Sequence, residues 1–235
     1  MTVKSILLFS LLSTTAIAAD DLQPNGHLVP EGDYCYTAKA GPKGKEQVMA
    51  LVRQQVVRKG DKMEVLVHQH IVPRKMDMID RFTLRAHDMT PNKLDHTMTG
   101  GQKVTLTYHM KGKEGHITGT RAGKKAGPVD VNFTGKIWEG NLWGTLYAAL
   151  PLDQKTSYSI PMYQYDKNLF SMEISDVRTT TIDFQGADTP VYEVDVKASG
   201  RTVTYYIRQS DRLELGYAMP GFSQWLGGDC SKLKG

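Results

Sequence analysis

Residues 191–209 read VYEVDVKASGRTVTYYIRQ, a stretch in which polar and apolar side chains alternate. Side chains at alternating positions of a β-strand lie on the same face of its sheet. One face would carry the apolar positions, which are Tyr192, Val194, Val196, Ala198, Val203, Tyr205 and Ile207. Gly200-Arg201 interrupts the alternation as a two-residue turn does. The stretch therefore predicts a β-hairpin with one buried face.

The same alternation extends over most of the chain. It recurs in QVMALVRQQVVRK, KMEVLVHQHIV, DRFTLRAH, KLDHTMT, QKVTLTYHM and LELGYAM. Short turns such as Gly60-Asp61, Thr90-Pro91-Asn92 and Ser210-Asp211 separate the segments, which favours an antiparallel meander over βαβ units. About a dozen strands are more than one flat sheet holds. We therefore expect a mainly β protein with a single strongly curved antiparallel sheet, either a half-barrel or an open barrel.

One segment departs from this pattern and predicts a short apolar helix over residues 138–150. At about 100° per residue, one broad arc of the helix is apolar, and it comprises Trp138, Leu142, Trp143, Leu146, Tyr147 and Leu150. Asn141 is suited to cap the helix and Pro151 to end it. Glu139 is the only charged residue, so we expect the sheet to wrap around this helix.

These six residues have two possible roles. A stripe of leucine and aromatic side chains usually fills a core, but it can also form one wall of a cavity that binds an apolar ligand. The nearby Met162, Met172 and Met219 have flexible side chains that suit either a filled gap or an adaptable binding surface. Both roles remain open at this stage.

The first residues predict export. Residues 1–18 combine Lys4, the apolar run Ile6 to Leu12 and the cleavage signal Ala16-Ile17-Ala18, which together are typical of a removed signal peptide. No later stretch is long and apolar enough to span a bilayer. We expect residues 19–235 to form a single exported β-rich domain in the periplasm.

The two cysteines, Cys35 and Cys230, lie near opposite ends of the mature chain. In an oxidising compartment such a pair predicts a disulfide that ties the tails, residues 20–32 and 221–235, together. A free catalytic thiol is the competing interpretation, and the chain has no C-x-x-C motif that would favour it.

Charge gives little indication of a partner. The formal net charge is +4, of which Lys4 contributes one. Five basic residues lie near two turns, namely Lys111, Lys113, Arg121, Lys124 and Lys125. They could meet an anionic lipid head group, but charged turns in water are the ordinary interpretation. We expect an apolar small molecule, a lipid or an envelope protein as partner, and no nucleic acid.

His68-Gln69-His70 is the sharpest chemical pattern. On a strand both imidazoles share a face, but zinc needs three or four protein ligands. Further candidate ligands are His87, Asp88, His96, His109 and His116, and no spacing selects one of them. A metal-dependent enzyme that uses His68 and His70 is thus a remote alternative to a solvated histidine pair. Nucleophile-elbow, phosphate-loop and zinc-protease motifs do not occur in the sequence, so we expect a non-catalytic protein without a cofactor.

Several segments resemble a known family. They are DRFTLRAHDMTPNKLDH (80–96), QKVTLTYHMKG, LYAALPL (146–152), YSIPMY and the hairpin from residue 191 onward. In their order they are similar to the periplasmic family known as domain of unknown function 3108, over residues about 64–219. The resemblance implies no catalytic residues. It implies an architecture like the half-barrels of lipoprotein carriers, which hold acyl chains between sheet and helix. The expected function is apolar-ligand binding; the alternative is a structural or interaction module of the envelope with a filled core.

Overall fold

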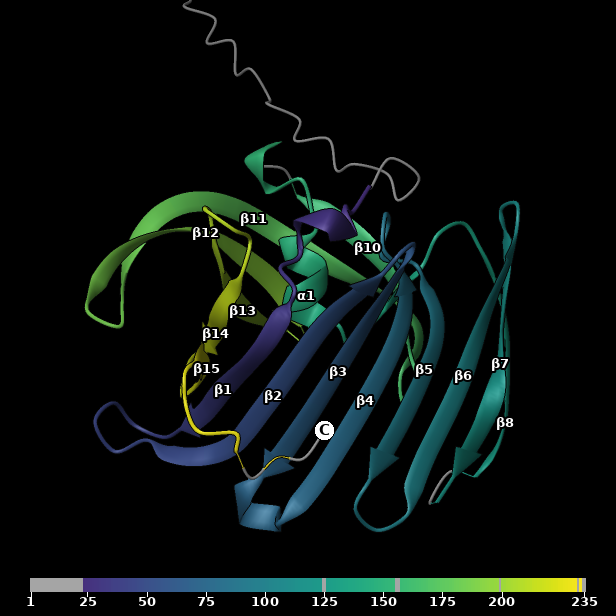
Figure 1. The fold of residues 1–235 in the computed structure, drawn as a ribbon, viewed down its shortest axis with the longest axis horizontal. Helices are drawn as coiled ribbons and strands as arrows, with labels where there is room; N and C mark the ends of the chain where they lie inside the picture. Colours follow the sequence, from purple (N-terminus) through teal and green to yellow (C-terminus); the bar gives the residue numbers. More distant parts are fainter. Residues whose placement is uncertain (1–22, 124–125, 155–156, 199, 232, 234–235) are drawn as a thin grey trace, which may run out of the picture.

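The computed structural model describes residues 23–123, 126–154, 157–198, 200–231 and 233. Within these ranges, fifteen strands form one curved sheet, and the only α-helix, α1 (Trp143–Ala148), lies inside its curve (Figure 1). Three short 3-10 helices complete the structure, η1 (Gly26–Leu28), η2 (Val72–Arg74) and η3 (Leu152–Gln154). This confirms the predicted fold class. The predicted signal peptide, residues 1–18, lies outside the described residues.

The strands follow each other with short connections in most places. They are β1 (Gly32–Ala40), β2 (Gln47–Lys59), β3 (Lys62–Ile71), β4 (Met76–Arg85), β5 (Pro91–Met98), β6 (Gln102–Lys111), β7 (Glu114–Ala122), β8 (Gly127–Thr134), β9 (Trp138–Glu139), β10 (Tyr158–Gln164), β11 (Asn168–Phe184), β12 (Ala187–Ala198), β13 (Arg201–Arg208), β14 (Glu214–Met219) and β15 (Phe222–Leu226). β5 begins at Pro91, so two of the three residues predicted as a turn, Pro91 and Asn92, belong to the strand.

The strand order shows how the sheet curves. From β1 the chain meanders outward to β8 at one edge, and residues 135–137 then connect β8 to β9 at the opposite edge. From β9 the order returns to β15, which pairs with β1. The sheet is therefore continuous where its first and last strands meet. It is open between β8 and β9, which follow each other in sequence without pairing.

The hairpin that indicated the fold is formed by β12 and β13. Tyr192 pairs with Ile207, and the register continues to Ala198 opposite Arg201. Arg201, predicted as part of the turn, is therefore the first residue of β13. Gly200 has φ of +76°, a backbone conformation that glycine adopts without strain. The apolar face is buried as predicted, with Val194 fully inaccessible.

The helix is shorter than its predicted range of 138–150. Trp138 and Glu139 form β9, which pairs in parallel with β10, the one parallel pair among the described strands. Parallel neighbours need a long crossover connection, and α1 lies in that crossover. Asn141 does not cap the helix; Leu142 occupies that position, and the Asn141 amide instead donates to Glu139 Oε1 at 3.2 Å.

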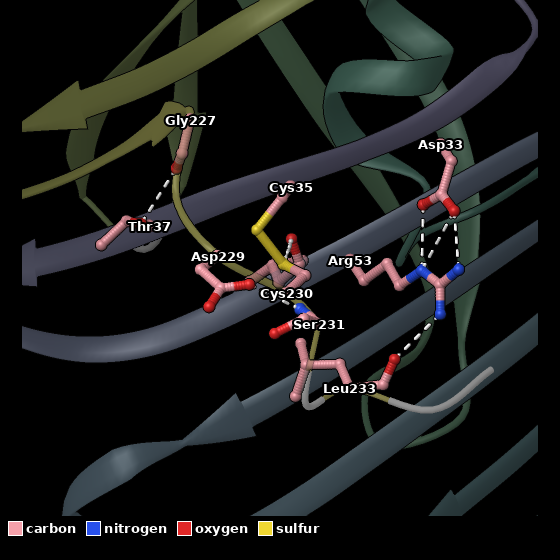
Figure 2. The surroundings of a disulfide bond; sticks show 10 residues. Asp33, Cys35, Thr37, Arg53, Gly227, Asp229, Cys230, Ser231 and Leu233 are labelled. Atoms are coloured by element: carbon pink, nitrogen blue, oxygen red, sulfur yellow. Dashed lines mark hydrogen bonds and ion pairs between the residues drawn. A yellow bond between two sulfur atoms is a disulfide. The ribbon is translucent and has the colours of Figure 1, made fainter.

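The predicted disulfide between Cys35 and Cys230 is present, with the two Cα atoms 5.7 Å apart. Figure 2 shows a second connection beside it. The Arg53 guanidinium donates to Asp33 through Nε at 2.9 Å and Nη2 at 2.6 Å, and to the Leu233 carbonyl through Nη1 at 2.9 Å. The C-terminal segment is therefore held against β1 and β2 both covalently and by hydrogen bonds.

The C-terminal segment contains a strand that the sequence analysis did not predict. Residues 221–235 were expected to form an extended tail, but Phe222–Leu226 form β15, which pairs with both β1 and β14. Thr37 Oγ1 donates to the carbonyl of Gly227 at 3.0 Å just beyond it (Figure 2). β15 thus joins the two halves of the sheet.

Candidate functional site

An apolar pocket lies beside the helix, against the half of the sheet formed by the later strands. Its volume is about 470 Å³, within the range of small-molecule sites. Its lining comprises Trp143, Tyr147, Lys167, Met172, Val196, Arg201, Val203, Tyr205, Tyr217, Met219 and Phe222. Nine of these eleven residues are apolar or aromatic, so the pocket suits a ligand that is mainly hydrocarbon.

The alternation of the strands places these side chains in the pocket. On β13, Val203 and Tyr205 are two residues apart and share the inner face, and Val196 is paired directly with Val203 on β12. Tyr217 of β14 is paired with Tyr205 across the next ladder. The pocket wall is therefore a set of cross-strand neighbours from three consecutive strands.

Aromatic rings form a continuous part of this wall. Tyr147 of α1 meets Tyr205 edge to face, with ring centroids 4.8 Å apart. The rings of Tyr205 and Tyr217 lie 5.0 Å apart, and Tyr217 stacks on Phe222 at 5.9 Å. Pairs in this distance range add stability beyond the area they bury, so the wall is rigid on the side of the helix.

The six residues predicted as a ligand lining divide into two groups. Trp143 and Tyr147 line the pocket, and Trp143 is 38% exposed. Trp138, Leu146 and Leu150 are fully buried and fill the core, while Leu142 lines a smaller neighbouring chamber. One segment therefore fills the core with some of its side chains and faces a cavity with others.

Two of the three methionines singled out from the sequence also reach the pocket. Met172 of β11 and Met219 of β14 line it, whereas Met162 of β10 is fully buried. Their unbranched side chains can follow ligands of different shape.

Two cations stand at the exposed rim of the pocket. Lys167 and Arg201 are solvent-exposed, and within the described residues neither forms an ion pair. Lys167 Nζ lies 5.6 Å from the centre of the Phe170 ring. An anionic group at the mouth would meet these charges in water, where such contacts contribute about 0–1 kcal/mol.

The histidine pair contacts a single carboxylate. His68 Nε2 and His70 Nδ1 each lie 3.0 Å from the same oxygen, Oδ1 of Asp77. These hydrogen bonds, with His68 the larger cause, lower the pKa of the Asp77 carboxyl. Among the residues that the structure describes, no group of three His, Cys, Asp or Glu could hold a metal ion.

The other candidate ligands are separated from this pair. His96 bonds to Asp80 at 2.7 Å, His116 to Asp130 at 2.7 Å, and His87 lies 3.5 Å from Asp88. His109 is within 3.3 Å of Thr118 Oγ1. Each of these pairs satisfies its own side chains.

Another cluster of polar side chains is buried near the gap between β8 and β9. His96 and Asp80 have side chains only 0% and 6% exposed, and the Tyr165 hydroxyl lies 3.4 Å from His96 Nε2. Nearby, Tyr108 donates to Glu139, whose pKa is raised to about 8 by burial. Because these groups are closed off and bonded to each other, we assign them to the core and not to chemistry on a substrate.

The fold and the pocket together define a class, the β-barrel-like proteins in which one curved, unclosed sheet surrounds a short helix and an apolar pocket. The chain belongs to the family described as "Protein of unknown function (DUF3108)", whose model matches residues 35–219. The match confirms the resemblance found in the sequence. It also begins earlier than residue 64, so β1 and β2 are part of the family's domain.

A solved structure supports the same class. The fold is similar to the crystal structure of a beta-barrel-like protein of domain of unknown function DUF1849 from Brucella abortus, with a TM-score of 0.54 and 10% identity over 85% of this chain and 95% of that one. At this identity the similarity concerns the fold alone. The sequence matches no curated protein. Within the described ranges, no helix is long and apolar enough to cross a membrane.

Proposed function

We propose that this protein is a non-catalytic periplasmic protein that binds an apolar ligand, such as an acyl chain, in the pocket beside α1. The observation that carries the proposal is the pocket itself, about 470 Å³ with a mainly apolar and aromatic lining. Large apolar surfaces facing solvent are unusual unless they bind something. Trp143, more than a third exposed at the pocket wall, contributes to the apolar surface that the pocket presents.

Compartment and chemistry agree with this proposal. The Cys35–Cys230 disulfide is typical of an oxidising compartment, and the predicted signal peptide would deliver the chain there. The described residues hold no group suited to a metal ion, and the family carries no assigned activity. The mainly apolar lining of the pocket supports a protein that holds a ligand without changing it.

Native mass spectrometry tests the proposal directly. Mature protein purified gently from its own periplasm should carry a lipid or other apolar molecule of defined mass, which organic extraction releases. A Trp143→Asp variant should lose this cargo. Leu169→Asp is the matched control, because Leu169 is similarly exposed at 42% but does not line the pocket. If wild-type protein is repeatedly free of cargo and takes up none of a set of added lipids, the pocket is not a binding site, and the envelope-interaction alternative is favoured.

A further inference from the structure

A small polar chamber adjoins the apolar pocket. Its volume is about 50 Å³, enough for one or two water molecules. Trp143, Tyr205 and Tyr217 line both cavities. We call the smaller one the Glu214 chamber; its other lining residues are Val52, Gln54, Val67, Gln69, Asn141, Leu142, Gly144, Glu214 and Gln224. It thus combines one carboxyl group with four amide side chains.

The carboxyl group of Glu214 has no hydrogen-bond or ion-pair partner within the described part of the chain. The residue is only 7% exposed, yet among the described residues no side chain or backbone group donates to its carboxylate or pairs with it. Its backbone carbonyl, in contrast, accepts from the Tyr36 hydroxyl at 3.1 Å. Buried carboxyl groups in proteins are ordinarily hydrogen-bonded or paired with a cation. Burial raises the pKa of Glu214 to about 7.

The surroundings of Glu214 suit a cation with several N–H donors. Trp143, Tyr205 and Tyr217 line both cavities, and aromatic rings attract ammonium groups. The Asn141 amide nitrogen is engaged with Glu139, so its oxygen remains available as an acceptor. A primary ammonium has three donors and no acceptor, which suits a chamber lined by one carboxylate and four amide side chains, each with an acceptor oxygen.

Arg201, one of the two rim cations, lies far from this chamber along β13. Arg201 and Ile207 are six residues apart on β13, and Glu214 is paired with Ile207. At about 3.3 Å per residue, Arg201 is about 20 Å from that end of the strand. The exposed charges of Arg201 and Lys167 are weakened by water, while the buried Glu214 acts at close range in a low dielectric. Glu214 therefore has the larger influence on which head group enters.

We infer that the Glu214 chamber binds the primary ammonium group of an amphiphile whose apolar chain occupies the adjoining pocket. This inference rests on the proposed function, because the chain needs the pocket. Beyond that function, it specifies the polar group of the ligand, a primary ammonium, and names Glu214 as the residue that selects this group.

Three probes with the same chain test the inference on the mature, disulfide-bonded protein. Dodecylamine, dodecanol and dodecanoate differ only in the head group, and calorimetric titration gives their affinities. Dodecylammonium should bind at least tenfold more tightly than dodecanol. Glu214→Gln keeps the shape of the side chain and should remove most of that preference, while dodecanol affinity stays within threefold. Trp143→Leu keeps an apolar wall without the aromatic face, and it should weaken dodecylammonium more than dodecanol.

The outcomes separate the two proposals. If none of the probes binds, the proposed function fails. If dodecanol binds and dodecylammonium shows no advantage, or if Glu214→Gln leaves that advantage intact, only the inference about Glu214 is wrong. Tighter binding of dodecanoate would also overturn it, and would place the head group at Lys167 and Arg201.

The pH dependence gives an independent readout. The titratable groups that face Glu214 are tyrosines, Tyr36 from β1, Tyr147 from α1, Tyr205 from β13 and Tyr217 from β14, and burial raises the pKa of each. The side chains that β2, β3 and β15 contribute to the chamber do not titrate. Between about pH 6 and pH 8 Glu214 is the lining residue that changes charge; Glu139, whose pKa is about 8, also titrates in this range but does not line the chamber and contacts it only through Asn141. Dodecylammonium affinity should therefore rise over this range. The Glu214→Gln variant should show no such rise, and a rise of equal size in that variant would contradict the inference.

Discussion

A methyl group placed on Gly144 would lie 2.0 Å from a carboxylate oxygen of Glu214. No real side-chain contact is this short, so the backbone of α1 passes directly against the acid, and a larger residue would force the Glu214 side chain to move. The helix and β14 are in this way fitted to each other at the inner end of the pocket.

The first prediction concerns this fit. Gly144→Ala should destabilise the protein by about 1–3 kcal/mol, the usual range for overpacking a buried site, measured by urea unfolding. Truncation at the other side, Glu214→Ala, makes room for the added methyl. The double variant should therefore be more stable than the sum of the single effects implies, a coupling that a double-mutant cycle measures. Strict additivity would contradict the close contact.

The second prediction concerns the disulfide. Cys35 and Cys230 are separated by 195 residues, and the loop-entropy model gives such a closure about 5 kcal/mol as an upper value. A reducing agent, or the Cys35→Ser/Cys230→Ser double variant, should lower the Tm by several degrees. The reducing agent should then have no further effect on the double variant. An unchanged Tm after reduction would mean that β15 and the Arg53 contacts alone hold the C-terminal segment.

The third prediction concerns pH and the buried Glu139. Its pKa in the folded protein is about 8, raised by burial, whereas in the unfolded chain it is near its ordinary value of about 4.3. The folded state therefore binds the proton more strongly, so this stabilising contribution is complete at low pH and is lost as pH rises towards 8. At about 1.4 kcal/mol per pKa unit, the loss is at most on the order of 5 kcal/mol. Glu139→Gln should flatten the decline of unfolding free energy between about pH 5 and 8; an equally steep decline in that variant would contradict the assignment.

The fourth prediction uses the tryptophans as reporters. Trp143 lines the pocket, whereas Trp138 is fully buried and donates through Nε1 to the Asp88 carbonyl at 2.9 Å. Binding of dodecanol should therefore shift the emission of the wild-type protein to shorter wavelength, because the indole of Trp143 loses contact with water. Trp143→Phe should bind the same probe with little change in emission. A shift of full size in that variant would assign the signal, and the ligand, to another part of the molecule.

Much of the fold could be predicted because alternation reports which face of a strand is buried. VYEVDVKASGRTVTYYIRQ forms the expected hairpin within one residue of its turn. The pattern failed where a strand is too short to show a period. β9 has only two residues, and Trp138 and Glu139 therefore read as the first turn of the helix that follows.

The site was predicted only in part, for a physical reason. Apolar side chains at helical spacing identify a buried segment, but they do not distinguish Trp143 and Tyr147, which face the pocket, from Leu146 and Leu150, which fill the core. No sequence pattern identified Glu214 as a site residue. Between the buried Leu213 and Leu215, alternation assigns it to the solvent face. The register shift between Tyr206 and Ile207, which no sequence pattern announced, breaks that alternation.

The pairing of β1 with β15 has a consequence for biogenesis. A chain that is delivered from its N-terminus presents β1 through β8 long before β15 exists, and during that time β1 has no partner on one side. An unpaired edge of this kind is a template for aggregation, and contacts between distant parts of a sequence form slowly. We therefore expect the newly made polypeptide to need protection by a holding chaperone until its last strand arrives, and truncations before residue 222 to aggregate although most of their strands are complete.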